Sequence, residues 1–495
     1  MSKIIIQNGN MCELDLPLKF AQKLYNEFAI RHPNAFYLRT RQRGMQNWDG
    51  KIHYITKTGQ FKIGLLPKVY DMCIEMGIKP KVVDMRQPLP KVSKVVTNIG
   101  KYKLRPEQEK AVKSVINNRV GDIPFQIGVL DLTVNFGKTL IMTSLYLSYK
   151  KQLKTLLITN DSDWLNQARE EFKQYLPGED ITFVQGKVLN WSNFTIGMVQ
   201  SISRNIRFYQ KELSQIDMVL VDEADQGGSK QYQNVITRLF NTRIRIGLSG
   251  TIYMSKLAKD KVKNMNLECF FGKVIAEFKL KDSIKNGYST KTIVKMVPGK
   301  PWYGNWESDC ISYKEIYDDS ITENNTAWTM AYNRLRWNIN QGRYPALVVC
   351  KHIAHCENLY KFFKKKLGDA YNIAYVHVNT PSKLRQQIMR DFREGKIDIL
   401  VSTTIIARGK NFPKLRYLLN AASMDSQEKS IQFLGRLVRT DKSKKKVYLD
   451  DLHYPGPYLD RHGKHRKQYY QRQELKVILL DKLWKKHPNH SLIKS

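Results

Sequence analysis

The feature that most constrains the fold is an apolar run that leads through a Gly-Lys-Thr motif into a helix-like stretch. The run covers residues 127–130, the motif is 137–139, and the helix-like stretch is 140–149. A second apolar run, 218–221, ends directly in the acidic tetrapeptide 222–225. A strand, a phosphate-binding loop and a helix in this order predict a parallel sheet, because the loop leaves the carboxyl end of a buried strand.

Apolar runs that alternate with amphipathic segments recur in two blocks of the chain. Strands buried on both faces that alternate with helices indicate parallel sheets. The runs are Thr155–Ile158, Phe194–Val199, Met218–Val221 and Ile244–Leu248 in the first block, and Ala346–Cys350, Ala374–Val378, Ile397–Ser402, Tyr417–Leu419 and Val447–Leu449 in the second. We therefore expect an α/β protein with two tandem parallel-sheet domains.

Smaller segments are expected at both ends of the chain. Residues 1–97 predict a basic α/β accessory domain, with a strand-rich stretch from Phe36 to Leu66. The two sheet domains are then expected at 98–286 and 287–453. Residues 454–495 carry ten Lys and Arg against three acids, and Leu475, Ile478, Leu479 and Leu483 are spaced as an apolar helical stripe. This pattern predicts a basic helical extension that packs on the rest of the protein.

The net charge is +37, from 82 Lys and Arg against 45 Asp and Glu. Self-repulsion of this size predicts a polyanionic partner, with nucleic acid favoured over an anionic membrane surface. No apolar run approaches the ~18 residues of a spanning helix. The six cysteines are widely spaced and form no disulfide framework, which predicts a reducing compartment, the cytoplasm.

One cluster of possible zinc ligands has two interpretations. Cys350, His352, His355 and Cys356 lie within seven residues. Structural zinc sites usually take ligand pairs from two separated segments. We therefore favour the interpretation that Cys350 ends a buried strand and the others begin the next helix.

The loop before the helix-like stretch 140–149 has the residues that phosphate binding needs. Lys138 is expected to contact the β- and γ-phosphates of ATP, and the Thr139 hydroxyl to reach Mg²⁺. Thr133, Asn135 and Gly137 are expected to line the loop. Asn135 stands where the common pattern has glycine, but asparagine tolerates left-handed backbone better than most residues. Nucleotide affinity is the property that this departure would affect.

Two further pairs of residues carry the expected hydrolysis chemistry. Asp222 is expected to hold Mg²⁺ through water, and Glu223 to position and deprotonate the attacking water. Arg436 and Arg439 lie three residues apart, on one face of a predicted helix in the second sheet domain. Across a cleft from the nucleotide, they can neutralise charge that builds on the γ-phosphate.

In combination, these motifs resemble those of the superfamily 2 helicases. The resemblance rests on Gly137–Thr139, Asp222–Asp225, Ser249–Thr251 and Gln432–Arg439, and it implies two RecA-like domains with ATP and Mg²⁺ between them. It also implies that Arg105 and Gln108 recognise adenine and that Gly409 contacts the nucleotide. Nucleic-acid contacts are implied at four further residues: Thr159, Gln200, Ser201 and Thr403.

The N-terminal region narrows the resemblance. Phe36–Arg39, Asn47–Ile52 and Gly64–Leu66 are similar to the accessory domain of the bacteriophage UvsW helicases. That family implies branch migration, fork regression and unwinding of RNA–DNA loops. The implied partners are branched, forked or single-stranded DNA and RNA–DNA hybrids, bound by a monomer in the host cytoplasm. The Gln-led motif at 432–439 suits DNA translocases better than the DEAD-box RNA helicases.

A basic surface on the accessory domain is the expected DNA contact. In a strand from Phe36, the side chains of Arg39, Arg41 and Arg43 would point to one face, and Lys51 follows the next turn. A solvated sheet face is the alternative interpretation. No recognition helix or zinc finger is present, so we expect binding that depends on DNA structure and tolerates any sequence.

Two other function classes remain open at this point. One is an RNA helicase or RNA-dependent ATPase. The other is an architectural DNA-binding protein without enzymatic activity. Its only support is Asn135, which departs from the common pattern of the phosphate loop.

Overall fold

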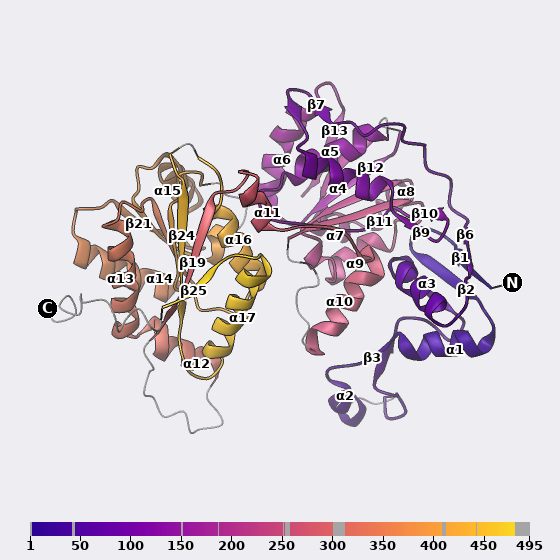
Figure 1. Ribbon diagram of the computed structural model, residues 1–495, viewed down its shortest axis with the longest axis horizontal. Helices are drawn as coiled ribbons and strands as arrows, with labels where there is room; N and C mark the ends of the chain where they lie inside the picture. The colour runs from indigo at the N-terminus through magenta and orange to yellow at the C-terminus, as the bar shows by residue number, and fades with distance from the viewer. Residues whose placement is uncertain are drawn as a thin grey trace. The chain divides into compact units, whose positions relative to one another are not determined.

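The computed structural model in Figure 1 describes residues 2–41, 45–149, 152–186, 188–250, 252, 258–299, 312–407, 412–441 and 443–480. The chain divides into two compact units. The first comprises residues 1–132 and 137–278, and the second comprises residues 133–136 and 279–495.

The first unit is built on an eight-stranded sheet with the order β14-β13-β15-β12-β16-β17-β11-β18. Every neighbouring pair is parallel except β13 with β14. The strands are β11 (Ile127–Leu132), β12 (Thr155–Thr159), β13 (Ile181–Gln185), β14 (Val188–Leu189), β15 (Phe194–Met198), β16 (Met218–Asp222), β17 (Ile244–Ser249) and β18 (Val274–Phe278). The prediction of a parallel sheet from buried apolar runs is confirmed.

Helices cover both faces of this sheet. They are α4 (Pro106–Ile116), α5 (Lys138–Ser148), α6 (Ser162–Tyr175), α7 (Val199–Arg204), α8 (Gln210–Ser214), η2 (Ala224–Gln226), α9 (Lys230–Ile236) and α10 (Ala258–Phe271). Two short hairpins flank α4, namely β7 (Asn98–Ile99) with β8 (Tyr102–Lys103) and β9 (Arg119–Val120) with β10 (Ile123–Pro124).

The N-terminal part of the first unit is a small mixed sheet with the order β5-β2-β1-β6. Its elements are β1 (Lys3–Ile6), β2 (Met11–Asp15), α1 (Leu18–Glu27), β5 (Gln60–Lys62), η1 (Ile63–Leu65), α3 (Leu66–Glu75) and β6 (Lys81–Asp84). A separate excursion carries β3 (Ala29–Arg31), α2 (Ala35–Arg41) and β4 (Lys51–His53).

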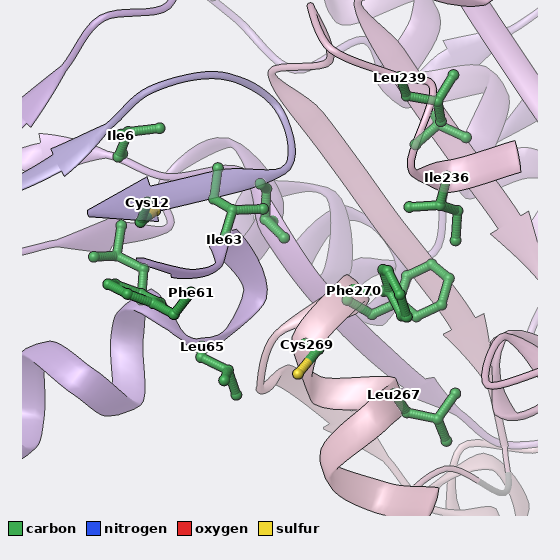
Figure 2. Packing of buried hydrophobic residues seen from close by; sticks show 14 of the residues in the cluster. Ile6, Cys12, Phe61, Ile63, Leu65, Ile236, Leu239, Leu267, Cys269 and Phe270 are labelled. Carbon is green, nitrogen blue, oxygen red and sulfur yellow. The ribbon is translucent and has the colours of Figure 1, made fainter. Parts of the chain in front are cut away.

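This small sheet shares one hydrophobic core with the large sheet. Figure 2 shows Ile63 and Leu65 of η1 beside Cys269 and Phe270 of α10, within a single buried cluster. The backbones approach so closely that a Cβ at Gly9 would lie 2.6 Å from the carbonyl oxygen of Leu239. The N-terminal sheet is therefore packed against the large sheet as part of the same compact unit.

A buried arginine links the two sheets. Arg245 lies in β17 and is fully buried. Its Nη2 donates to the carbonyl of Gly9 (2.6 Å) and to Asn10 Oδ1 (2.8 Å), and its Nη1 donates to the carbonyl of Phe270 (3.1 Å). Burial, and to a smaller extent the charge of Arg86, lower the pKa of Arg245 to about 9.

The second unit is built on a seven-stranded parallel sheet with the order β21-β22-β20-β23-β24-β19-β25. The strands are β19 (Lys291–Pro298), β20 (Ala346–Cys350), β21 (Ile373–Val376), β22 (Ile399–Thr403), β23 (Tyr417–Asn420), β24 (Lys446–His453) and β25 (Val477–Leu479). The second tandem RecA-like domain is therefore confirmed as a parallel α/β sheet.

Helices cover both faces of this second sheet. One face packs against α12 (Tyr313–Tyr317), α13 and α14, and the other against α15 and α16. The remaining bounds are α11 (Leu280–Lys285), the π-helical turn η3 (Asp318–Thr322), α13 (Asn325–Ile339), α14 (Ile353–Leu367), α15 (Ser382–Glu394), η4 (Thr404–Ala407), α16 (Gln427–Leu437) and α17 (Leu459–Arg472).

The predicted strand from Phe36 is wrong, because Ala35–Arg41 form helix α2. The side chains of Phe36 and Tyr37 are 79% and 55% exposed, so no alternating burial selects a strand. Residues two apart on a helix point about 200° apart, so Arg39 and Arg41 do not share one face. Arg43 lies outside the described residues.

The predicted helical stripe near the C-terminus is also wrong. Val477–Leu479 form strand β25, which pairs in parallel with β19 through Val294 and Met296. The apolar, β-branched run extends the sheet beyond β19, and Leu475 and Leu480 on either side of it are buried. Helix α17 instead comprises the polar residues that precede this run. The packing of the segment on the body of the protein is as predicted, whereas Leu483 lies outside the described residues.

We expect Arg245→Ala to destabilise the first unit by about 3 kcal/mol, because it leaves a cavity and three acceptors without their donor. The measurement is the urea unfolding midpoint. The control is Arg238→Ala on the exposed surface, which should change stability by less than about 0.5 kcal/mol. Equal midpoints for the two variants would contradict the tethering role of Arg245.

The second unit should lose stability in mild acid through His355. This side chain is buried, with its Nδ1 3.2 Å from the Tyr317 hydroxyl, and burial, then nearby His352, lower its pKa to about 3. Below about pH 6.5 the unfolded chain binds a proton that the folded chain does not, so stability falls as pH falls.

The variant His355→Gln removes this difference in proton binding. Between pH 6.5 and 5 its stability should fall by about 2 kcal/mol less than that of the unaltered protein, measured by urea unfolding at each pH. An identical pH dependence in both proteins would show that His355 does not resist protonation.

Candidate nucleotide and nucleic-acid site

The carboxyl ends of four neighbouring strands bring the predicted site residues of the first unit together. In the parallel register, Asp131 of β11 pairs with Ser249 of β17, and Asp222 of β16 pairs with Leu248. Thr159 ends β12, the next strand along. Because these strands run in the same direction, the segments that follow them meet at one edge of the sheet.

The loop between β11 and α5 has the backbone geometry of an anion site. Asn135 and Gly137 have φ values of 64° and 85°, both left-handed. Among the described residues, no side chain caps the N-terminus of α5, which begins at Lys138. The first backbone N–H groups of this helix can therefore donate to a ligand. The Thr133 hydroxyl is buried and has no hydrogen-bond partner in the part of the chain that the structure describes. These features fit a bound phosphate group.

Lys138 lies against the acidic tetrapeptide. Its Nζ is 3.3 Å from Asp222 Oδ1, and Asp222 is almost fully buried. Burial acts to lower the pKa of Lys138, but the charges of Asp222, Glu223 and Asp225 outweigh it and raise that pKa. The ammonium group therefore stays charged at the position where phosphate oxygens are expected.

Glu223 is held in a strained position beside this pair. Its φ of 52° is left-handed, which is uncommon for a residue with a long side chain and often marks a functional site. Gln226 Nε2 donates to Glu223 Oε2 at 3.5 Å. Gln226 also accepts from Asn160 Nδ2, and Gln200 Nε2 donates to the Asn160 carbonyl (3.3 Å).

These amides form a chain from Glu223 to α7 that the sequence did not predict. Gln200 was expected only as a nucleic-acid contact, and Gln226 and Asn160 were not expected at all. Their common signal is that each follows the carboxyl end of a predicted strand closely.

A buried hydrogen bond joins the acidic motif to the Ser-Gly-Thr motif. Ser249 Oγ donates to Asp225 Oδ1 at 2.7 Å, and both side chains are buried. The acidic motif and the Ser-Gly-Thr motif are thus physically connected at adjacent strand ends. Thr251, the last residue of the second motif, lies outside the described residues.

The predicted adenine-recognition residues lie at the start of α4. The backbone N–H of Arg105 donates to Gln108 Oε1 at 2.9 Å, and the Gln108 side chain is buried. A Cβ added at Gly137 would collide with Gln108 Nε2. Gln108 therefore lies directly against the loop that carries Lys138.

In the second unit, Arg436 lies in the last turn of α16, and Arg439 follows one residue after the Val438 cap. Both are half-buried, as is Gln432 one turn before Arg436. The Arg439 carbonyl accepts from Thr290 Oγ1 at 3.2 Å. Lys444, which no sequence motif indicates, further fixes the end of the helix.

Lys444 is buried and donates from Nζ to the carbonyls of Leu415 and Leu437, both at 3.0 Å. Burial lowers its pKa to about 8, with Arg416 and Arg439 acting in the same direction against Asp441. Its contact with Leu437 anchors the last turn of the helix that presents Arg436.

The residues expected to contact nucleic acid lie in both units. Thr159 is buried at the end of β12 in the first unit, and Thr403 is buried at the end of β22 in the second. Gln200 and Ser201 lie in α7, where Ser201 Oγ accepts from the N–H of Gly186 (2.9 Å). Gly409 lies outside the described residues.

In the N-terminal excursion, Lys51 is exposed in β4. Arg41 lies over the Tyr37 ring at 5.1 Å. Trp48 Nε1 donates to the Lys51 carbonyl (2.9 Å), so the indole packs at the turn.

Asp222 and Thr139 carry hard oxygen atoms that could hold Mg²⁺, an ion that is usually bound by one or two carboxylates together with substrate phosphates. Within the described ranges, no group of three or more His, Cys, Asp or Glu side chains is arranged to hold a metal ion. Cys350 ends β20 and His352 caps α14, as expected for a strand followed by a helix. None of the described helices is both long and apolar enough to span a membrane.

Comparison with known proteins gives two family matches. Residues 101–254 match the family described as "Type III restriction enzyme, res subunit", and residues 331–441 match "Helicase conserved C-terminal domain". Together the matched ranges cover more than half of the chain.

Three curated relatives are similar over most of this chain. The ATP-dependent DNA helicase uvsW of Enterobacteria phage T4 is 21% identical over 82% of each chain. Putative helicase 22 of Sulfolobus islandicus filamentous virus and the putative ATP-dependent helicase IRC3 of Saccharomyces cerevisiae are each 22% identical, over 71% and 70% of this chain. The chain spans only 64% and 51% of the length of those last two relatives.

Among solved structures, a fragment of a putative HsdR subunit of a type I restriction enzyme from Vibrio vulnificus has the same fold. It superposes with a TM-score of 0.56 at 14% identity, covering 75% of this chain and 68% of that one.

We expect Gly137→Ala to weaken nucleotide binding strongly. The new methyl group would displace Gln108 and also force a left-handed backbone, which alone costs about 1–2 kcal/mol. Gly178→Ala is the matched control, because Gly178 has a similar φ of 82° but nothing within 4 Å of an added Cβ. The measurement is the Kd of a fluorescent ATP analogue, and equal affinities in the two variants would contradict the placement of Gln108.

Proposed function

We propose that this chain, which belongs to the superfamily 2 helicases, is an ATP-driven DNA translocase that remodels branched DNA. The observation that carries the proposal is the arrangement of Lys138, Asp222 and Glu223 at one edge of the first sheet. A charged lysine beside a buried carboxylate and a strained glutamate is suited to phosphoryl transfer to water.

In this proposal each residue at the edge has one task. The amides at the start of α5 and the Lys138 ammonium group bind the phosphates of ATP. Thr139 and Asp222 would hold Mg²⁺, and the bound ion would supply positive charge that offsets the charge of the phosphates. Glu223 accepts the proton of the attacking water, and the amide of Gln226 holds its carboxylate in position.

The second unit is proposed to complete the site. Arg436 and Arg439 bring positive charge to the phosphates when the two RecA-like domains close on ATP. The hydrogen bond from Lys444 to the Leu437 carbonyl holds the end of α16, where both arginines lie. Hydrolysis then reverses this closure. Closure and opening in alternation step the protein along one nucleic-acid strand.

DNA is proposed as the substrate because uvsW, named a DNA helicase, is similar over 82% of both chains. The Gln-led motif at 432–439 and the net charge of +37 are consistent with a structure-dependent DNA motor. Forks, four-way junctions and RNA–DNA loops are the proposed substrates, and ATP with Mg²⁺ is the proposed energy source.

The test is ATP hydrolysis by the unaltered protein with forked DNA, four-way junctions, single-stranded DNA and RNA, alongside unwinding of the branched forms. We expect the largest stimulation and unwinding with branched DNA. Stimulation by RNA alone would instead support an RNA-dependent ATPase. Binding of DNA without any hydrolysis would support an architectural protein.

Lys138→Ala should abolish DNA-stimulated hydrolysis, by at least about 100-fold, while leaving DNA affinity unchanged. Lys211→Ala is the control, since Lys211 is exposed on α8 and donates no hydrogen bond from its ammonium group to any described residue. Normal hydrolysis by Lys138→Ala would overturn the assignment of the phosphate site.

A further inference from the structure

A group of cations surrounds an exposed tryptophan on the second unit. Trp337, near the end of α13, is 42% exposed. Its ring centroid is 4.7 Å from the Arg343 guanidinium, 4.8 Å from Lys295 Nζ and 5.1 Å from the Arg334 guanidinium. We call these four residues, together with Tyr448, Lys291 and Lys446, the Trp337 cluster.

Only part of the positive charge in this cluster is neutralised. Arg334 donates to Asp450 Oδ2 at 2.6 and 2.9 Å. Arg343 lies 3.6 Å over the Tyr448 ring and donates to the neutral amide of Asn338 (2.9 Å). The ammonium group of Lys295 makes no hydrogen bond or ion pair with any residue that the structure describes. Asp450 therefore offsets Arg334 and leaves the other two charges unmatched.

Two more lysines continue the cluster along the same face of the sheet. Lys291 and Lys446 are direct partners in the register of β19 and β24, and both are exposed. Strand alternation places Lys291 on the face of Lys295, and Lys446 on the face of Tyr448. Like charges in register on adjacent strands repel each other, so this part of the surface favours an anion.

Lys295 is half-buried beside two arginines. Burial is the main cause that lowers its pKa; Asp450 opposes this effect, and the charges of Arg334 and Arg343 add to it. A bound anion would relieve this repulsion.

The cluster is distant from the motifs of the second unit that the sequence identified for nucleic-acid contact. Thr403 lies at the carboxyl end of β22, whereas Lys291 and Lys446 begin β19 and β24. In a parallel sheet these are opposite edges. An anion at the cluster would therefore be held apart from a strand that passes Thr403.

We propose that the Trp337 cluster binds backbone phosphates of a DNA duplex and holds a second arm of the branched substrate. Three cations already approach the indole ring, so it supports their side chains and is not open for stacking on an unpaired base. Phosphate contacts without base contacts suit a duplex of any sequence. This inference rests on the proposed function as a DNA motor.

The test uses the full chain with Lys295→Gln and Lys446→Gln combined. The control combines Lys383→Gln and Arg390→Gln, two exposed cations on α15, which packs on the other face of the sheet. Both variants lose the same net charge. Affinity for a blunt duplex, a four-way junction and a single-stranded oligonucleotide is measured by fluorescence anisotropy at several salt concentrations.

We expect the cluster variant to bind the duplex and the junction about tenfold more weakly, with a log–log salt slope reduced by about 2. Its affinity for the single strand and its hydrolysis with that strand should match the control. The hydrolysis measurement distinguishes this proposal from the proposed motor function. If DNA does not stimulate hydrolysis by the unaltered protein, the motor function is contradicted but DNA binding by the cluster is not.

Equal duplex and junction affinity in the two variants would overturn the proposal and leave an acidic protein segment as the better partner for the cluster. Equal weakening for single-stranded and duplex DNA would also overturn it, since the cluster would then lie on the path of the translocated strand. Trp337→Leu provides a second variant, which should reproduce part of the duplex defect by releasing the three cations from the ring.

Discussion

The arrangement of the candidate site depends on the parallel packing of strands that are buried on both faces. In the first unit, β11, β12, β16 and β17 lie side by side and run in one direction. Their ends must therefore meet at one edge, although the residues that follow them are far apart in sequence. Lys138 reaches Asp222, and Ser249 reaches Asp225, only because this constraint is satisfied.

The N-terminal sheet is also part of this first unit. Arg245 lies near the start of β17, and its side chain donates to the backbone of the turn between β1 and β2 at Gly9. The shared hydrophobic core around Phe270 has the same effect through apolar contacts. Because the small sheet is packed against the large one, any ligand bound there would be held by the same compact unit as Lys138 and Asp222.

An element could be predicted from the sequence where local patterns determine its structure, and could not where contacts with distant residues determine it. The strands of both large sheets were predictable, because complete burial demands continuous apolar runs. The loop at 133–139 was predictable because Gly-Lys-Thr follows an apolar run and precedes a helix-like stretch, and Asn135 and Gly137 both tolerate the left-handed backbone that the loop adopts. Helix α2 was not, since it is largely exposed and only local hydrogen bonds decide its conformation. Strand β25 was not, because its apolar run fits a helix as well until the open edge of β19 is known. The amide chain from Glu223 to Gln200 needs three strand ends to be adjacent, which no local pattern encodes.

The second unit separates two kinds of positive charge on the two faces of one sheet. On the face of α16, Lys444 donates hydrogen bonds to main-chain carbonyls and so fixes the helix end at Leu437. On the face of α13, Lys295 has no such partner among the described residues, and aromatic rings rather than carboxylates hold its neighbour Arg343. Cations that serve the fold are neutralised or bonded to oxygen, whereas cations left unmatched at the surface retain their charge for a ligand. Single exposed lysines such as Lys211 are also unmatched among the described residues, so the gathering of three cations around one indole ring is what distinguishes the Trp337 cluster.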